Sequence, residues 1–349
     1  MIGDFTKLLY SKCCRRGEEL NFTNKDNKGE YYYEEKMLVA ILMGTMVFGL
    51  AACGNESGND ENANKETTNK EATNQEASSG EAEKSTEAPK GEISVISREE
   101  GSGTRGAFIE LFGIEEKDAS GEKIDNTTED AQVTNNTSVM MTSVAGNPQA
   151  IGYISLGSLD DSVKALKVDG AEATAENVKS DTYKIARPFN IATKEGVSET
   201  AQDFISYILS QEGQKIVEDN GYISVGDDAA AYAGTKPSGK IVIAGSSSIT
   251  PVMEKLKEGY KEVNPNAEIE IQQSDSTTGM ESTVNGICDI GMASRELKDS
   301  EIEAGLKGQE IALDGIAVIV NNKNSMSDIT TDQVKDIYTG EITEWSDLQ

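Results

Sequence analysis

The sequence has 349 residues, 61 of them acidic and 32 basic, and its formal net charge is −29 at pH 7. This charge argues against a general nucleic-acid binder, which needs a basic face to neutralise phosphates, and against adhesion to an anionic membrane through a polybasic patch. The sequence has no histidine, so a histidine-based triad, zinc site or general base is excluded.

The cysteines do not indicate a disulfide framework. Cys13, Cys14, Cys53 and Cys288 form no CxxC pair. Cys288 lies in an apolar stretch, where a buried and inert thiol is expected.

A short apolar run near the N-terminus predicts a secretion signal. Residues 37–52 are apolar over 16 positions and end at Cys53. A membrane span needs roughly 20 residues, whereas a signal peptide needs fewer. The residues around Cys53 resemble a bacterial lipobox, so we expect 37–53 to be a lipoprotein signal and Cys53 to be the lipidated N-terminus. An ordinary signal with a chance cysteine is the alternative. Residues 1–36 then form an upstream extension that is not part of the fold.

The next segment predicts a disordered tether. Residues 54–91 contain no Ile, Leu, Val or aromatic residue. Such a composition cannot bury enough apolar surface to order a chain.

From residue 92 onward, strand and helix patterns alternate along the chain. Strands are predicted at 92–97, 240–245, 267–273 and 315–322, and helices at 105–112, 198–219 and 251–263. The continuous apolar run at 315–322 is typical of a parallel central strand. The Gly-, Ala- and Asp-rich residues 226–238 predict a connector between two blocks. The alternation predicts an α/β fold with mainly parallel sheets.

Three loops rich in small residues each lead from a strand into a helix. They span 98–108, 244–251 and 272–280. A helix N-terminus preceded by such a loop presents backbone N–H groups and hydroxyls, which favours an anion. The first loop is not a nucleotide P-loop, because no lysine follows Gly103. Ser102 is not a nucleophile either, since there is no histidine to activate it.

These loops carry a family resemblance. The segments that bear it are SREEGSGTR (97–105), NPQAIGYISLG (147–157), RPFNIATK (187–194), FISYILSQEGQKIVEDNGYISV (204–225), AGSSSITP (244–251), DIGMASREL (289–297), DGIAVIVN (314–321) and TGEITEWSDL (339–348). Together they closely resemble the phosphate-binding proteins of bacterial Pst-type ABC transporters, over essentially all of 92–349. The resemblance implies the type II periplasmic-binding-protein fold, with two α/β lobes that close on a ligand in the cleft between them.

The order of the blocks departs from that family. There the block found here at 239–349 comes first and runs into the SREEGSGTR block. The departure indicates a circular permutation, which is tolerated where the original termini lie close together at the surface. A damaged or misassembled gene is the alternative. The expected organisation is one lobe at 92–184, a return segment at 185–225, the connector at 226–238 and the other lobe at 239–349.

The resemblance also implies the ligand residues. Arg98, Ser102, Gly103 and Thr104 would form one wall, with Arg98 donating two N–H groups to two phosphate oxygens. A surface ion pair of Arg98 with Glu99 or Glu100 is the alternative. The facing wall would hold Ser247, Ser248, Ser276, Thr277 and Ser294.

Discrimination against sulfate requires a hydrogen-bond acceptor, because phosphate carries a proton near neutral pH and sulfate does not. Some family members have an aspartate where this sequence has Ser294. Glu100 and Asp314 are therefore the candidate acceptors.

The expected function is capture of inorganic phosphate on the outer face of a membrane, of the Gram-positive type, for ABC permease subunits and their ATPase. We expect a monomer without enzymatic activity, cofactor or metal, attached to the membrane through its lipid alone and independent of nucleic acid. The alternatives are a carrier for sulfate or molybdate, a secreted phosphatase, and a surface phosphate sensor or adhesin that does not transport.

Overall fold

The computed structural model describes residues 90–226 and 228–348. By its contacts the chain divides into units 1–78 and 79–349, and all described residues belong to the second. The predicted upstream extension, the lipoprotein signal with Cys53 and nearly all of the predicted tether lie outside the described residues. Within the described part, no helix is both long and apolar enough to cross a membrane.

A first hydrophobic core, here called the core of lobe 1, is built around Ile96, Phe108, Tyr153, Ile319 and Trp345, each at most 1% exposed. Its elements are β1 (Ser94–Arg98), α2 (Gly103–Leu111), β2 (Glu115–Lys117), β3 (Lys123–Asp125), β4 (Gln132–Thr134), α3 (Thr137–Gly146), β5 (Ala150–Ser155), η2 (Leu156–Ser158), β6 (Lys164–Ala165), β7 (Lys167–Val168), α4 (Ala175–Lys179), β13 (Asp328–Ile329), α10 (Thr331–Thr339) and η3 (Trp345–Leu348). Burial of these apolar and aromatic side chains stabilises the lobe.

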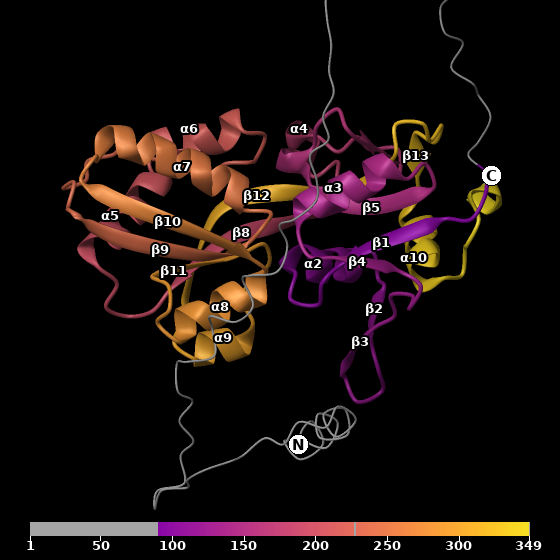
Figure 1. Cartoon of the computed structure of the whole chain (residues 1–349), viewed down its shortest axis with the longest axis horizontal. Helices are drawn as coiled ribbons and strands as arrows, with labels where there is room; N and C mark the ends of the chain where they lie inside the picture. Colours follow the sequence, from indigo (N-terminus) through magenta and orange to yellow (C-terminus); the bar gives the residue numbers. More distant parts are fainter. Residues whose placement is uncertain (1–89, 227, 349) are drawn as a thin grey trace, which may run out of the picture. The chain divides into compact units, whose positions relative to one another are not determined.

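A second core, that of lobe 2, is built around Phe189, Phe204, Ile243, Leu256 and Ile290. Its elements are β8 (Ala186–Thr193), α5 (Glu199–Ile208), α6 (Gln211–Asp219), β9 (Gly239–Ser246), α7 (Thr250–Val263), β10 (Ala267–Ser274), α8 (Ser276–Val284), β11 (Ile290–Ala293) and α9 (Asp299–Glu303). Helices α7 and α8 cover opposite faces of the strands of this lobe (Figure 1). The α/β class predicted from the sequence is confirmed.

One long strand, β12 (Lys307–Val320), belongs to both lobes. Its first part pairs with β8 as far as Gly315, and its last part pairs with β5 from Ile316 onward. The strands follow the order β10-β9-β11-β8-β12-β5-β1-β4, and β6 also pairs with β12. The sheet therefore continues from one lobe into the other through β12.

The direction predicted for the strand at 315–322 is wrong. β12 runs antiparallel to both β8 and β5, whereas β9 pairs with β10 and β11 in parallel, and β1 with β4 and β5. An apolar run reports that both faces of a strand are buried, and it carries no information about the direction of the neighbours.

Two other predicted boundaries need correction. The sequence assigns 239–349 to one lobe, but Ile316, Tyr338 and Trp345 pack in the core of lobe 1 because β12 carries the chain across (Figure 1). The helix predicted at 198–219 is two helices, α5 and α6. Ser210 separates them: its hydroxyl donates to the Tyr207 carbonyl at 2.6 Å and accepts from the Gly213 N–H at 3.2 Å, which caps α6.

The predicted connector, 226–238, docks on lobe 2. Asp203 of α5 accepts hydrogen bonds from the Tyr232 hydroxyl and, at 2.9 Å, from the Thr235 N–H. Asn264 donates to the Pro237 carbonyl at 2.9 Å. The connector therefore runs along lobe 2 and is fixed there by polar contacts.

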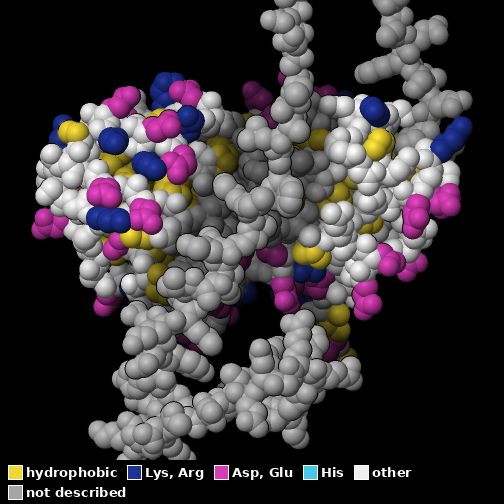
Figure 2. All heavy atoms as spheres, viewed as in Figure 1, with side chains coloured by type: hydrophobic (Ala, Val, Ile, Leu, Met, Phe, Trp, Pro, Cys, Tyr) yellow, Lys and Arg dark blue, Asp and Glu magenta, His cyan; other side chains and the backbone are white. Residues whose placement is uncertain are grey.

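Basic side chains do not gather on the face of the molecule seen in Figure 2. Lysines and arginines are interspersed with aspartates and glutamates there, over both lobes (Figure 2). A nucleic-acid footprint would need a basic stripe.

Candidate functional site

Seven hydroxyl side chains from the two lobes meet in one buried group, here called the hydroxyl cluster. Its members, each at most 5% exposed, are Thr104, Thr137, Ser246, Ser247, Ser248, Ser276 and Ser294. The Thr104 hydroxyl lies 2.9 Å from Ser248 Oγ and 3.3 Å from Ser294 Oγ. Ser246 donates to Ser294 Oγ at 3.0 Å. Hydroxyls both donate and accept, so the group is suited to surround an oxyanion.

Three of these hydroxyls, those of Thr104, Thr137 and Ser276, lie in the first turn of a helix. α2 begins at Gly103 after the cap Ser102, α3 begins at Thr137 after Asn136, and α8 begins at Ser276 after Asp275. Each cap side chain accepts a hydrogen bond from a backbone N–H in the first turn. Three helix N-termini therefore converge on the cluster, and their dipoles favour negative charge there.

The two lobes approach each other closely at Gly103. A Cβ atom at this position would lie 2.6 Å from Ser276 Oγ and 2.9 Å from Ser294 Oγ. Both distances are too short for a real side chain. Only glycine allows the start of α2 to meet the facing loop of lobe 2.

Arg98, at the end of β1, carries the charge that the sequence predicts for the site. It is 2% exposed, and its Nη2 donates to Ser247 Oγ of lobe 2 at 3.1 Å. Its Nε and Nη2 also donate to the Glu99 carboxylate at 2.8 and 2.7 Å. The ion pair with Glu99 is therefore present, but on a buried guanidinium that also reaches the hydroxyl cluster.

A tyrosine supports the backbone at Arg98. The Tyr153 hydroxyl accepts from the Arg98 N–H at 3.1 Å and lies 3.0 Å from Ser97 Oγ. Its ring stacks on Phe108 with the ring centroids 3.9 Å apart. Burial raises the pKa of Tyr153 to about 12, so the phenol stays neutral and holds the end of β1 without adding charge.

A second buried arginine, which the sequence does not predict, reaches the cluster from β8. Arg187 Nη2 donates to Thr104 Oγ1 at 3.1 Å, and its Nη1 contacts the Asp314 carboxylate. Asp314 is fully buried and also accepts from the Gly157 N–H at 3.3 Å. Burial raises the pKa of Asp314, while the charge of Arg187 acts in the opposite direction.

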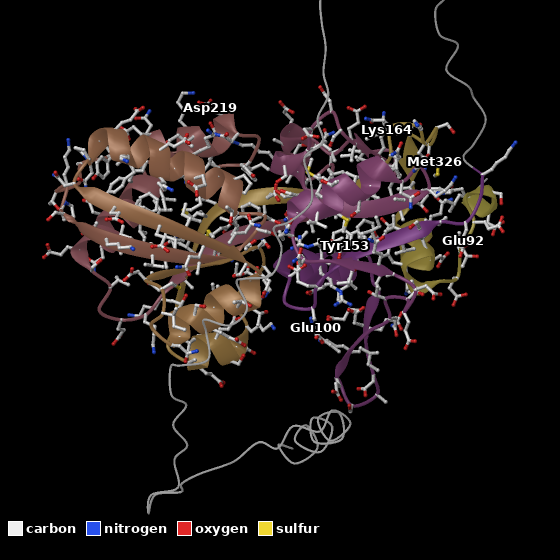
Figure 3. The ribbon with its side chains drawn as sticks, viewed as in Figure 1. Glu92, Glu100, Tyr153, Lys164, Asp219 and Met326 are labelled. Carbon is white, nitrogen blue, oxygen red and sulfur yellow. The ribbon has the colours of Figure 1, made fainter. Side chains whose placement is uncertain are left out.

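The remaining predicted residues lie around this centre. Ser102 is buried and caps α2. Thr277 is half-buried and donates to the Gly101 carbonyl at 3.2 Å. Glu100 is exposed (Figure 3). The structure thus unites Arg98, Gly103, Thr104, Ser247, Ser248, Ser276 and Ser294 at the lobe interface and leaves Thr277 and Glu100 at its edge.

Three members of the site do not follow from the sequence. Ser246 lies in the small-residue loop predicted at 244–251, whereas Thr137 opens α3, a helix that the sequence analysis does not predict. Arg187 opens the segment RPFNIATK, which bears only part of the family resemblance. Nothing in the local pattern around Arg187 distinguishes a site residue from a surface arginine.

A groove of about 750 Å³ opens beside the hydroxyl cluster, lined by Ser102, Arg105, Arg187, Thr277 and Arg295 among others. It touches residues of both lobes. Arg105 pairs with Asp125 at 2.6 Å, and Arg295 with Glu301 at 2.7 Å. Through Arg187, which donates to Thr104, the groove borders the hydroxyl cluster.

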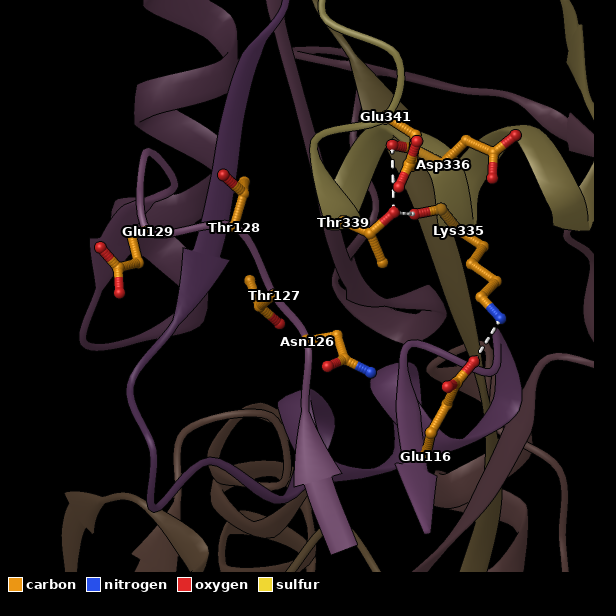
Figure 4. A pocket seen from close by; sticks show the side chains of 9 residues that line it. All are labelled: Glu116, Asn126, Thr127, Thr128, Glu129, Lys335, Asp336, Thr339 and Glu341. Carbon is orange, nitrogen blue, oxygen red and sulfur yellow. Dashed lines mark hydrogen bonds and ion pairs between the residues drawn. The ribbon is translucent and has the colours of Figure 1, made fainter. Parts of the chain in front are cut away.

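A hollow of about 880 Å³ lies elsewhere, between the β3–β4 loop and α10 (Figure 4). Glu116, Glu129, Asp336 and Glu341 line it, and its lysine, Lys335, is bound to Glu116 at 2.7 Å. None of its lining residues belongs to the hydroxyl cluster, so its larger volume does not make it the site.

Comparisons with known proteins agree with this arrangement. A family model described as the PBP superfamily domain matches residues 24–212 and 230–349. "Phosphate-binding protein PstS 2" of Streptococcus agalactiae is 61% identical over 265 residues, which cover 76% of this chain and 90% of that protein. The protein of the same name from Streptococcus pneumoniae is 42% identical over 315 residues, 90% of this chain and 99% of that protein.

A solved structure also matches. It is the crystal structure of a phosphate ABC transporter phosphate-binding protein from Streptococcus pneumoniae, with 45% identity and a TM-score of 0.60 over 74% of this chain and 100% of that one. The fold and the site define a two-lobed binding protein of the periplasmic-binding-protein superfamily. Within that class, the chain belongs to the PstS-like phosphate-binding protein family.

The block order is shared with these relatives. A single match, in which the aligned residues follow the same order in both chains, spans 90% of the Streptococcus agalactiae protein. Such an alignment requires the SREEGSGTR block to come first in both chains. A sequence rearranged by damage would not share its order with a relative at 61% identity, so a damaged gene is not supported.

Proposed function

We propose that this chain captures inorganic phosphate outside the cell and delivers it to an ABC importer. The observation that carries the proposal is the buried meeting of Arg98 with hydroxyls of both lobes. Membership of the PstS-like family supports it, as do the relatives named as phosphate-binding proteins. Those relatives are named for binding rather than for a reaction, so the proposed role is that of a carrier and not of an enzyme.

The chemistry of the site fits a tetrahedral oxyanion. A dianion that leaves water needs donors aimed at its oxygens, because an unpaired buried charge costs several kcal/mol. In the structure the hydroxyls bond one another across the lobes, as Thr104 does with Ser248 at 2.9 Å. A ligand that enters would accept the hydrogen bonds that the hydroxyls now donate to one another, while Arg98 supplies the positive charge.

Finer features of the role belong to the proposal as well. We propose that Cys53 is lipidated, that the tether 54–91 keeps the lobes near the membrane, and that ABC permease subunits with their ATPase receive the ligand. We further propose that the protein acts as a monomer. The apolar run that ends at Cys53 and the polar composition after it support the anchor.

A calorimetric titration tests the proposal. The chain from residue 54 onward contains every described residue and is titrated with phosphate and then with sulfate. We expect saturable phosphate binding at one site and much weaker binding of sulfate. Equal or tighter binding of sulfate or molybdate would instead show a general oxyanion carrier. Absence of phosphate binding would refute the proposal.

An enzyme or a protein that does not transport would behave differently from a carrier in two further assays. Turnover of a phosphate ester would indicate a phosphatase. Binding without restored uptake, in a strain that lacks other phosphate carriers, would indicate a sensor or an adhesin.

The identity of the proton acceptor stays a prediction. Glu100 is exposed, and the Asp314 carboxylate contacts Arg187 and the Gly157 N–H. Among the described residues, neither carboxylate has a hydrogen bond to a member of the hydroxyl cluster. Glu100→Gln and Asp314→Asn are each titrated with phosphate and with sulfate. The acceptor is the residue whose replacement reduces the difference in affinity between the two ions.

A further inference from the structure

Arg187 lies on β8, which pairs with the strand that passes between the lobes, and it donates a hydrogen bond to Thr104 of the hydroxyl cluster. We propose that Arg187 is a positioning residue of the anion site: it fixes the direction of the Thr104 hydroxyl, and Asp314 fixes Arg187. This inference rests on the proposed function and adds a residue to it.

The contacts of Arg187 leave its guanidinium little freedom. Its Nη1 contacts the Asp314 carboxylate and donates to the carbonyls of Asp314 and Gly315 at 3.2 and 3.1 Å. Its guanidinium lies over the ring of Phe189, 5.0 Å from the centroid. At 3% exposure, the side chain is almost fully buried. Its Nη2 is therefore held toward Thr104.

This bond determines what Thr104 can do. A guanidinium donates hydrogen bonds and never accepts them. The 3.1 Å bond from Arg187 Nη2 therefore occupies a lone pair of Thr104 Oγ1, and the Thr104 proton must point to another acceptor. In the structure the oxygens of Ser248 and Ser294 lie at 2.9 and 3.3 Å. In a loaded site an anionic oxygen is the stronger acceptor, so Arg187 makes Thr104 a committed donor to the anion.

The position of Arg187 is set by the crossover strands. In the β8–β12 ladder Arg187 lies directly opposite Asp314, and β12 continues from there into lobe 1. Thr104, in contrast, belongs to α2 of lobe 1. The direction of a hydroxyl in the cluster therefore depends on strand pairing at the junction of the lobes, and not on the neighbouring loops alone.

The test is a double-mutant cycle on phosphate affinity, in the chain from residue 54 onward. Arg187→Met combined with Asp314→Asn removes both buried charges and leaves neither unpaired. Thr104→Val removes the hydroxyl at nearly constant volume. We expect each change to weaken binding by about tenfold or more, from the worth of one hydrogen bond to a charged ligand. We expect the combination to be no weaker than Thr104→Val alone, because Arg187 acts through that hydroxyl.

A second cycle covers the case in which the neutralised pair folds poorly. Arg187→Lys keeps the charge opposite Asp314 but loses the planar fork. It should lose affinity in the parent and lose none in the Thr104→Val background. Arg105→Met is the matched control, because Arg105 lines the same groove but its side chain pairs with Asp125, and it should bind like the parent.

The outcomes separate the two proposals. If the parent fails to bind phosphate, the proposed function fails. If the parent binds and the losses simply add, Arg187 acts on the anion directly or on the fold as a whole, and the positioning role is refuted. Parental affinity in the Arg187→Met/Asp314→Asn variant would refute it as well.

Discussion

Arg98 Nη2 lies 3.1 Å from Ser247 Oγ, although the two residues are 149 positions apart and belong to different lobes. One donates from the end of β1, and the other stands in the loop that follows β9. Both side chains are buried. The candidate ligand site is therefore assembled from both lobes, and the following changes test it.

Arg98→Ala should weaken phosphate binding by at least about a hundredfold. The change removes the proposed bidentate, charge-assisted contact with phosphate, for which each hydrogen bond is worth roughly 1.5–3 kcal/mol. Arg98→Lys should recover only part of the loss, because an ammonium keeps the charge without the planar fork. Ser102→Ala should cost less than Arg98→Ala, since it removes a neutral hydroxyl. Calorimetry measures the affinity of all three variants. Arg105→Ala is the control and should keep parental affinity. Parental affinity in Arg98→Ala would show that this loop does not contact the ligand.

Gly103→Ala should weaken phosphate binding by about tenfold or more, since the new methyl group would lie 2.6 Å from Ser276 Oγ and must push the lobes apart. Gly106→Ala, one turn further along α2, is the matched control because no atom lies within 4 Å of its added Cβ. It should keep parental affinity and raise the free energy of unfolding by about 0.5–1 kcal/mol, as expected for alanine within a helix. Equal affinities in the two variants would show that the lobes do not need this close approach.

Asp203→Ala should destabilise the fold by about 2–4 kcal/mol and leave phosphate affinity unchanged. Its carboxylate accepts from the hydroxyls of Tyr232 and Tyr260 and from the Thr235 N–H, and it thereby fixes the connector to lobe 2. Denaturant unfolding gives the stability, and limited proteolysis should show faster cleavage within 226–238. The exposed Asp219, paired with Lys215, is the control, and Asp219→Ala should change the stability by less than about 0.5 kcal/mol. Unchanged proteolysis in Asp203→Ala would mean that other contacts hold the connector.

Cys53→Ala should release the protein from the membrane fraction or leave its signal uncleaved. The cysteine is the proposed site of lipid attachment, and a thioether cannot form at alanine. Fractionation and mass spectrometry of the mature N-terminus measure both results. A parent protein that is already soluble and unlipidated would contradict the anchor.

Much of the local structure could be predicted from the sequence, because it depends on neighbouring residues. Alternating apolar patterns located β1, β9 and β10 to within two residues at each end. The helix predicted at 251–263 is α7, which has Pro251 in its first turn. The small-residue loops before α2 and α8 indicated an anion site, since helix N-termini and capping hydroxyls act locally.

Only the tertiary structure decided how these pieces meet. The apolar run at 315–322 could not reveal that β12 is antiparallel on both sides, or that it carries the C-terminal residues into lobe 1, because burial depends on partners far along the chain. Arg187 and Thr137 have no local signal. Arg187 reaches the hydroxyl cluster through Thr104, across 83 positions, and Thr137 through Ser247 and Ser248, across 110 and 111 positions. The sequence by itself determined which residues can bind an anion. The pairing of β8 with β12 decided which of them stand together, because hydrogen bonds between distant strands set the distance between the lobes.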